Sequence, residues 1–264
     1  MDAKKEKNEM KELNIVVVGI GGVGSALVPK LCRYCQHIKP QVPVSLVLID
    51  GDLYEQNNAN RQSFHRFGNK AEVTVEALAP QFDRIQLSAI AEFLKPDNID
   101  FIIAEGSIVF LCVDNNTSRK MVDDFTHKFK NIVVICGGND MTDGNVQIYI
   151  RRKGKDITAS LADIHPEIAS PQGKAPYQMN CEELAMASSP QLFFANDLVS
   201  ALMCLVFYQI IEVKDFLDKP RFGELYFDML LGRVESVVRN PVVKVAQVDR
   251  KKCKGKSKPA KKGR

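Results

Sequence analysis

The residues that most clearly suggest a binding or catalytic site lie in the first quarter of the chain. An apolar run, Ile15–Val18, leads into Gly19-Ile20-Gly21-Gly22-Val23-Gly24. Glycines at 19, 21 and 24 match a turn in which missing side chains let backbone N–H groups and a helix N-terminus approach phosphate closely. A second apolar run ends at Asp50, where nucleotide-binding βαβ units often present an acid to a ribose hydroxyl. The two runs predict a nucleotide cradle.

Polar and cationic residues follow the second run. Asp52, Asn58 and Arg61 come shortly after Asp50, Lys70 follows in Gly68-Asn69-Lys70, and Asp114-Asn115 closes a later apolar run. The default occupants of such a cradle, NAD or FAD, fit poorly, since a hydride-transfer site needs an apolar slot and usually one acid or base. Cations aimed at phosphate, with an Asp able to hold Mg²⁺, are what splitting a triphosphate requires, because its charge must be neutralised. The residues therefore predict a site for ATP and Mg²⁺.

Four sequence blocks resemble the ThiF-like adenylyltransferases, relatives of the ubiquitin-activating enzymes and of the molybdopterin-synthase adenylyltransferase. In order, they are G-x-G-G-V-G-S at Gly19–Ser25, D-x-D…N-x-N-R-Q at Asp50–Gln62, G…K-A at Gly68–Ala71 and D-N-x-x-x-R at Asp114–Arg119. The segment Cys181–Met203 is similar to the bacterial subgroup of PRTRC-system ThiF proteins. The resemblance is strong over the first half of the chain and weaker from Arg151 to Val248.

This resemblance implies a role for each residue of the cradle. Asp50 would hold the ATP ribose, Asn58 and Arg61 would contact the phosphates, Lys70 would meet the phosphate chain, and Asp114 would organise Mg²⁺. The interval from Gly68 to Lys70 is one residue shorter than the family's G-x-x-K. The residues expected at the nucleotide are Gly19, Gly21, Gly22, Gly24, Asp50, Asp52, Asn58, Arg61, Lys70, Asp114 and Asn115.

The implied reaction is adenylation of the C-terminal carboxylate of a ubiquitin-like or sulfur-carrier protein that ends in Gly-Gly. Arg61, Lys70 and Asp114 would be its catalytic groups. In the activating enzymes a cysteine of the crossover region accepts the modifier as a thioester, and Cys181 occupies such a segment here. The alternative for Cys181 is an ordinary loop cysteine in an enzyme that stops at the adenylate.

Two other functions stay open at this point. One is ThiF-like adenylation of a small carboxylate or a modified tRNA base, and the other is a non-catalytic nucleotide-binding protein. Members of the family are commonly two-fold dimers, so a homodimer is expected.

The apolar patterning predicts an α/β fold, a Rossmann-like, mostly parallel sheet flanked by helices. An irregular crossover segment at 151–190 and C-terminal strands complete it. Strands are expected at 14–18, 44–49, 85–89, 108–113, 132–136, 145–150, 222–228 and 232–238, and helices at 23–37, 69–80, 116–129 and 191–213. The apolar run Leu198–Ile211 is too short to span a bilayer and is expected to be a buried helix.

Charge divides the chain into a body and a tail. Residues 250–264 hold nine of the 36 Lys and Arg and no acid, leaving 27 basic against 32 acidic residues elsewhere. We expect a charged extension at 1–13, an adenylation domain at 14–248 and a basic disordered tail at 249–264, through which alone nucleic acid could bind. Seven cysteines, an odd number, suit a reducing cytoplasm. Cys32 and Cys35 have zinc-like spacing but no second pair, so zinc is not expected.

Overall fold

A computed structural model describes residues 12–38, 42–60, 62–179, 183 and 192–242. The predicted basic tail therefore lies outside the described residues. The strands are β1 (Leu13–Val18), β2 (Val44–Ile49), β3 (Leu53–Tyr54), β4 (Gly68–Asn69), β5 (Ile85–Ile90), β6 (Ile108–Leu111), β7 (Ile132–Asn139), β8 (Asp143–Arg152), β9 (Lys155–Asp156), β10 (Glu224–Asp228) and β11 (Arg233–Val237). The helices are α1 (Gly22–Cys35), α2 (Lys70–Leu78), α3 (Ile99–Ile102), α4 (Asn116–Thr126), α5 (Leu161–Ile164), α6 (Pro166–Ala169) and α8 (Phe193–Glu212), with short 3₁₀ turns η1 (Gln56–Asn60), η2 (Ala79–Gln81) and η3 (Pro176–Gln178).

Within the described residues, nine strands form one sheet in the order β11-β10-β8-β7-β6-β1-β2-β5, with β9 beside β8. The five strands from β7 to β5 run parallel, and β8 to β11 join antiparallel. From β1 the chain builds outward through β2 and β5, then returns to add β6 on the other side of β1. The carboxyl ends of β1 and β6 thus flank a topological switch point, where open α/β sheets bind ligands. The predicted Rossmann-like α/β fold is confirmed.

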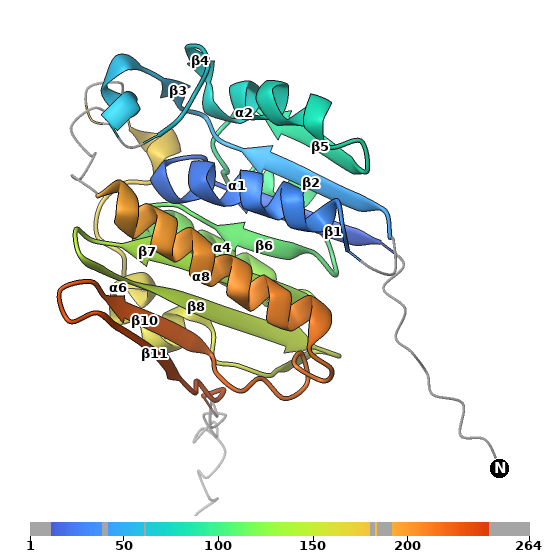
Figure 1. Ribbon diagram of the computed structural model, residues 1–264. Coiled ribbons are helices and arrows are strands. Elements are labelled where there is room, and N and C mark those ends of the chain that lie inside the picture. The colour runs from blue at the N-terminus through green and yellow to red at the C-terminus, as the bar shows by residue number, and fades with distance from the viewer. Residues whose placement is uncertain (1–11, 39–41, 61, 180–182, 184–191, 243–264) are drawn as a thin grey trace, which may run out of the picture.

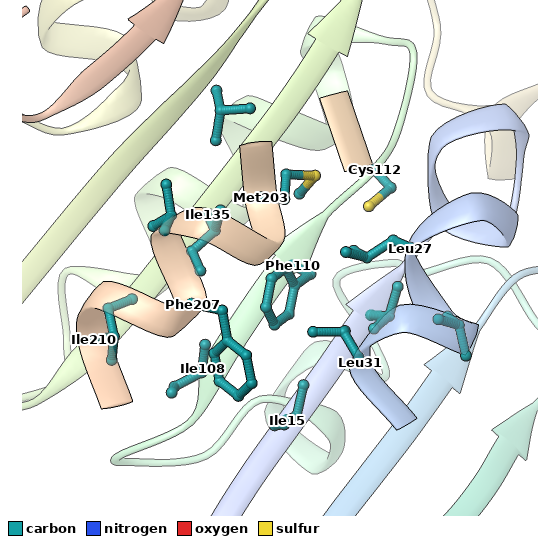
Figure 2. Packing of buried hydrophobic residues seen from close by; sticks show 14 of the residues in the cluster. Ile15, Leu27, Leu31, Ile108, Phe110, Cys112, Ile135, Met203, Phe207 and Ile210 are labelled. Carbon is teal, nitrogen blue, oxygen red and sulfur yellow. The ribbon is translucent and has the colours of Figure 1, made fainter. Parts of the chain in front are cut away.

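Alternate residues of β1 face opposite layers. Ile15 and Val17 pack with α1 and α8, while Val16 and Val18 pack with the layer that contains α4. Figure 1 shows α1 and α8 side by side across one face of the sheet. Figure 2 shows Phe207 of α8 against Phe110 of β6, beside Leu31 of α1.

Helix α8 is long and apolar enough to cross a membrane, judged by length and composition alone. Half of its most apolar stretch is buried inside the protein. It packs against α1, β7 and β8. Met203 and Phe207 are at most 1% exposed. The predicted helix is present but only one face of it is buried, and at 20 residues it is longer than the run Leu198–Ile211 that was predicted too short to span a bilayer.

The main differences from the predicted elements arise where pairing is non-local. β7 continues to Asn139 and β8 starts at Asp143, because Gly137, Gly138 and Asn139 pair with the partner strand. The predicted strands at 132–136 and 145–150 were therefore too short. The β3–β4 pair and α3 were not predicted, since none is long enough to show periodicity. β1 begins at Leu13, one residue before the expected domain start.

Candidate functional site

The glycine turn joins β1 to α1 at the carboxyl edge of the sheet. Gly19 has φ +89°, and a Cβ there would lie 2.9 Å from the carbonyl oxygen of Cys112. Only glycine meets both conditions without strain. The N-cap residue of α1, Gly21, makes no side-chain capping hydrogen bond. No side chain in the described part of the chain caps the first-turn N–H groups of α1, an arrangement suited to an anion.

Asp50 connects this turn to the end of β2. Its Oδ2 accepts a hydrogen bond from the N–H of Ile20 at 2.5 Å, and its Oδ1 accepts one from the N–H of Asp52 at 2.8 Å. Burial raises the pKa of Asp50 to about 6, although the nearby Lys70 ammonium acts in the opposite direction. Each carboxylate oxygen has a second lone pair, so a ribose hydroxyl can still bind there.

Lys70 and Asp52 form an ion pair beside the turn. The Lys70 Nζ lies 2.9 Å from the Asp52 Oδ2, and the Lys70 side chain is 8% exposed against 43% for Asp52. Asn69 connects the loop that carries Asp52 to the helix that begins at Lys70. Its Nδ2 donates to the carbonyl oxygens of Asp50 and Asp52, and its Oδ1 accepts from the first-turn N–H groups of α2. Lys70 is therefore held at the cavity despite the short interval from Gly68.

Asp114 and Asn115 follow β6 and introduce α4. Asp114 is exposed. The Asn115 Oδ1 accepts from the N–H of Ser118 at 2.8 Å, which caps α4, while its Nδ2 is buried without a partner. Arg119, one turn into α4, donates from its Nη2 to the Val113 carbonyl at 3.0 Å and from its Nη1 to Asn116 at 3.2 Å.

These groups border one cavity of about 580 Å³, a size typical of small-molecule sites. The glycine turn, the β7–β8 hairpin and β10 all contribute to its lining. Of the predicted residues, the lining includes Gly19, Gly21, Gly22, Asp50, Asp52, Lys70, Asp114 and Asn115. It also includes Gly138, Asn139, Asp140, Asp143, Gly144, Asn145, Pro176, Met179, Tyr226 and Phe227.

Unpaired buried polar atoms collect around this cavity. Among the described residues, the buried side-chain atoms that lack a hydrogen-bond partner are Gln62 Oε1, Asn115 Nδ2, Arg119 Nε, Asn139 Oδ1 and both polar atoms of Asn196. The first four residues line the cavity, and Asn196 lies against Gly22, which also lines it. Because native proteins pair nearly all buried polar groups, this clustering is typical of a site that binds a polar ligand.

The other predicted site residues are placed differently. Gly24 lies in the first turns of α1 and does not line the cavity. Asn58 also lies outside the lining, and its Oδ1 accepts from the N–H of Glu55 in its own turn. Its phosphate role stays a prediction. Arg61 and Cys181 lie outside the described residues.

Several residues at the site were missed from the sequence. Asn69, Asn139, Asn196 and Tyr226 were not assigned, and Gln62 and Arg119 were seen only as parts of motifs. Asn69 had a usable signal, because it is a residue type that favours the N-cap and stands at the start of the helix predicted at 69–80. Asn196 had a weaker one, an amide in an otherwise apolar helix. The others become visible only through tertiary contacts.

The side chains at the cavity can be compared with those that hold Mg²⁺ in proteins. The described residues contain no group of three or more His, Cys, Asp or Glu side chains that could hold a metal ion. Mg²⁺ bound with a nucleotide is commonly held by one or two carboxylates plus phosphate oxygens. The exposed carboxylate of Asp114 at the cavity fits that arrangement.

A glycine turn, a buried acid after the second strand and a cavity at the switch point together define a nucleotide-binding protein of the Rossmann-like class. The chain belongs to the ThiF family, since the family's model matches residues 3–228.

Among curated relatives, the molybdopterin-synthase adenylyltransferase of Salmonella typhimurium is 26% identical over 61% of this chain and 63% of its own length. The adenylyltransferase and sulfurtransferase uba4 of Aspergillus niger is 26% identical over 44% of this chain, which spans only 23% of that relative. The tRNA threonylcarbamoyladenosine dehydratase of Haemophilus influenzae is 25% identical over 77% of this chain and 73% of its own length.

Solved structures share the fold. E. coli MccB, solved with succinimide, superimposes with a TM-score of 0.64 at 18% identity, covering 88% of this chain and 65% of MccB. At that level of identity, the likeness establishes the architecture alone.

Proposed function

We propose that this protein is an ATP-dependent adenylyltransferase that activates a carboxylate. One observation carries the proposal: the uncapped first turn of α1, the Lys70 ammonium and the Asp114 carboxylate all border the same cavity. A triphosphate needs donors and a cation for its charge, and a metal-holding carboxylate beside them. An NAD-dependent dehydrogenase also binds a pyrophosphate at a helix N-terminus, but it needs no metal-holding carboxylate beside that site.

The reaction needs little covalent chemistry from the protein. An oxygen of the acceptor carboxylate attacks the α-phosphorus of ATP, the bond to the β-phosphate oxygen breaks, and pyrophosphate leaves with its electron pair. The acceptor is already ionised at neutral pH, so no general base is required. Lys70 and Arg61 would stabilise the departing pyrophosphate, and the α1 N-terminus would hold the phosphate chain. Mg²⁺, held through Asp114, would supply further neutralisation of phosphate charge.

The names of relatives support this assignment. The Salmonella and Aspergillus relatives are named adenylyltransferases, and MccB has been solved with ATP. This chain spans 63% of the length of the Salmonella relative and 23% of the Aspergillus relative.

For the acceptor, we favour the C-terminal carboxylate of a ubiquitin-like or sulfur-carrier protein ending in Gly-Gly. Where the β7–β8 hairpin lines the cavity, Asp140 and Asp143 are exposed, and the Asn139 Oδ1 is buried without a partner. These hydrogen-bond acceptors suit the N–H groups of a peptide main chain. Gly138 and Gly144 let Arg119 and Phe227 pack directly against the hairpin.

A modified tRNA base is the second candidate, favoured by the Haemophilus relative. Acidic groups at the cavity argue against a polyanionic RNA unless the basic tail compensates. A non-catalytic nucleotide-binding role would require neither Asp114 nor an acceptor.

Cys181 would form the thioester if the reaction continues beyond the adenylate. Cys112 and Cys136 are poor substitutes, because both are buried and burial raises the pKa of each thiol. A Cys181→Ala variant should still form the adenylate but lose a reducing-agent-sensitive adduct with the carrier. An adduct that persists in this variant would move the role to another cysteine.

We also propose a cytoplasmic homodimer. Phe194, Leu198, Ala201, Leu205 and Tyr208 recur along α8 at helical spacing, and Phe194, Leu205 and Tyr208 are 43–56% exposed. The stripe is nearly the same read from either end (aromatic, Leu, Ala, Leu, aromatic), which suits a two-fold contact. Leu205→Glu should convert the dimer to monomer in analytical ultracentrifugation. A wild-type monomer would overturn this proposal.

Calorimetry tests nucleotide choice directly. We expect wild-type protein to bind Mg-ATP and not NAD, and tight NAD binding without a response to ATP would refute the adenylation proposal.

The acceptor is tested with a small Gly-Gly-ending protein encoded beside this gene, incubated with Mg-ATP. Intact mass spectrometry after acid quench should show the carrier gaining AMP. A substrate tRNA labelled in its place would favour the second candidate.

A further inference from the structure

Asn196 is an unexplained polar residue in the buried face of α8. Its side chain is 1% exposed, and neither its Nδ2 nor its Oδ1 has a hydrogen-bond partner among the described residues. Its neighbours on the buried side of the helix, Ala195 and Val199, are apolar and fully buried. An amide with two unpaired polar atoms in such surroundings is strongly unfavourable in the free protein.

The amide of Asn196 faces the phosphate loop. A Cβ built on Gly22 would lie 2.3 Å from the Asn196 Nδ2, 2.7 Å from its Cγ and 2.9 Å from its Oδ1, so the amide group packs directly on the glycine. Gly22 is the first residue of α1 and lines the cavity. In Figure 1 the starts of α1 and α8 lie next to each other at the same edge of the sheet.

Two kinds of group at this place can satisfy the amide. The uncapped N–H groups of the first turn of α1 can donate to the Asn196 Oδ1. A phosphate oxygen at that helix N-terminus can accept from the Nδ2. A hydrogen bond to a charged phosphate would offset the desolvation of the amide more fully than a neutral one.

We infer that Asn196 is a further nucleotide-binding residue, donating from its Nδ2 to the phosphate chain at the start of α1. This rests on the proposed function, because it requires a phosphorylated nucleotide in the cavity. Asn196 is unsatisfied in the free protein for the same reason that it binds: its partner arrives with the ligand. Gly22 serves the same end, since a side chain at position 22 would displace the amide.

Asn196→Ala tests this without knowledge of the acceptor. Calorimetry with Mg-ATP and with adenosine separates the phosphate contribution from the rest of the site. We expect ATP affinity to fall about 10- to 100-fold, the range for a hydrogen bond to a charged group, while adenosine affinity stays unchanged. The melting temperature of the free protein should be equal to or above that of wild type, because an unpaired buried amide is removed.

Ser200→Ala is the matched control. Ser200 is fully buried one turn further along α8, and its Oγ is paired with Asp197 and Lys30. Removing it should lower the melting temperature without a selective loss of ATP. Asn196→Leu, which keeps the number and branching of the side-chain heavy atoms, should lose ATP affinity as Asn196→Ala does, and it tests whether the loss in Asn196→Ala comes from a cavity in α8.

The outcomes separate the two proposals. Wild-type protein that binds no ATP would overturn the proposed function and this inference together. ATP binding by the wild type with unchanged affinity in both Asn196 variants would overturn only the role of Asn196. An equal loss of ATP and adenosine affinity with a lowered melting temperature would also overturn it, and would make Asn196 a packing residue.

Discussion

Two buried polar regions of this protein lie close together and differ in one respect. Around Glu224, which is fully buried, every partner is present: the carboxylate accepts hydrogen bonds from Asn145, His165 and Arg239 at 2.7–2.8 Å. Around the cavity, by contrast, Gln62 and four other described residues keep unpaired polar atoms. Burial of polar groups is thus used for stability in one region and for ligand binding in the other.

We expect the largest effect from a substitution among the paired polar groups around Glu224. These hydrogen bonds hold the pKa of Glu224 at about 2, so it is ionised across the physiological range. Glu224→Gln should lower the free energy of unfolding by about 3–5 kcal/mol in urea denaturation, because it leaves His165 and Arg239 without their carboxylate. Glu235→Gln is the control: its ion pair with Arg233 is half-exposed on β11 and should cost less than about 1 kcal/mol. Similar losses in both variants would remove the distinction.

Asp114→Ala should do the reverse, leaving the fold intact and disabling the cavity. The carboxylate is exposed, so its loss removes no packing. With a Gly-Gly carrier as acceptor, ATP–pyrophosphate exchange should fall by about 10²-fold or more, the scale for one preorganised electrostatic partner. The stimulation of ATP binding by Mg²⁺ should disappear with it. Near-normal exchange in a folded variant would rule out the metal role.

Asp50 is intermediate between the paired groups around Glu224 and the unpaired groups at the cavity. Both of its oxygens accept hydrogen bonds, but these do not fully offset the cost of burying its charge. Because its folded pKa of about 6 is above the unfolded value, its stabilising contribution is full below about pH 4 and is lost as pH rises to about 6. The difference in free energy of unfolding between wild type and Asp50→Asn should change by about 2 kcal/mol across that window. A flat difference would mean that Asp50 has an ordinary pKa.

We expect the smallest effect from a substitution among the unpaired polar groups at the cavity. Asn115→Asp keeps the Oδ1 cap of α4 but replaces the unpaired Nδ2 by an anionic oxygen. The negative charge at the N-cap is favoured by the α4 dipole, which offsets the cost of burying it, so free-protein stability should change by less than about 1 kcal/mol. Calorimetric ATP affinity should fall about 10-fold, because a hydrogen-bond donor is replaced by an anion. If stability falls and binding does not, the Nδ2 of Asn115 has no ligand role.

Local sequence patterns were enough for the frame of the site. The runs at β1, β2 and β6 and the glycine turn were predictable because strand periodicity and turn chemistry are properties of neighbouring residues. Asp114 was predicted near the turn because the carboxyl ends of parallel strands share an edge, whereas Lys70 was assigned through the resemblance to the ThiF-like adenylyltransferases.

The remainder depends on contacts between distant segments. Asn196 meets Gly22 only because α8 packs beside α1, and Glu224 meets His165 only after β10 joins β8. The strand assignment of Gly137 and Gly138 follows from cross-strand pairing, which overrides the turn preference of glycine. No single segment of the chain carries this information.

The Lys70–Asp52 pair has a consequence for selectivity. With its ammonium 2.9 Å from a carboxylate of its own chain, Lys70 already has an anionic partner, and any ligand that takes the lysine must displace it. We therefore expect Asp52 to compete with any incoming anion for Lys70, at an effective concentration set by the fold. A monoanion such as chloride should bind Lys70 weakly, whereas a polyphosphate, which engages several donors at once, should displace Asp52.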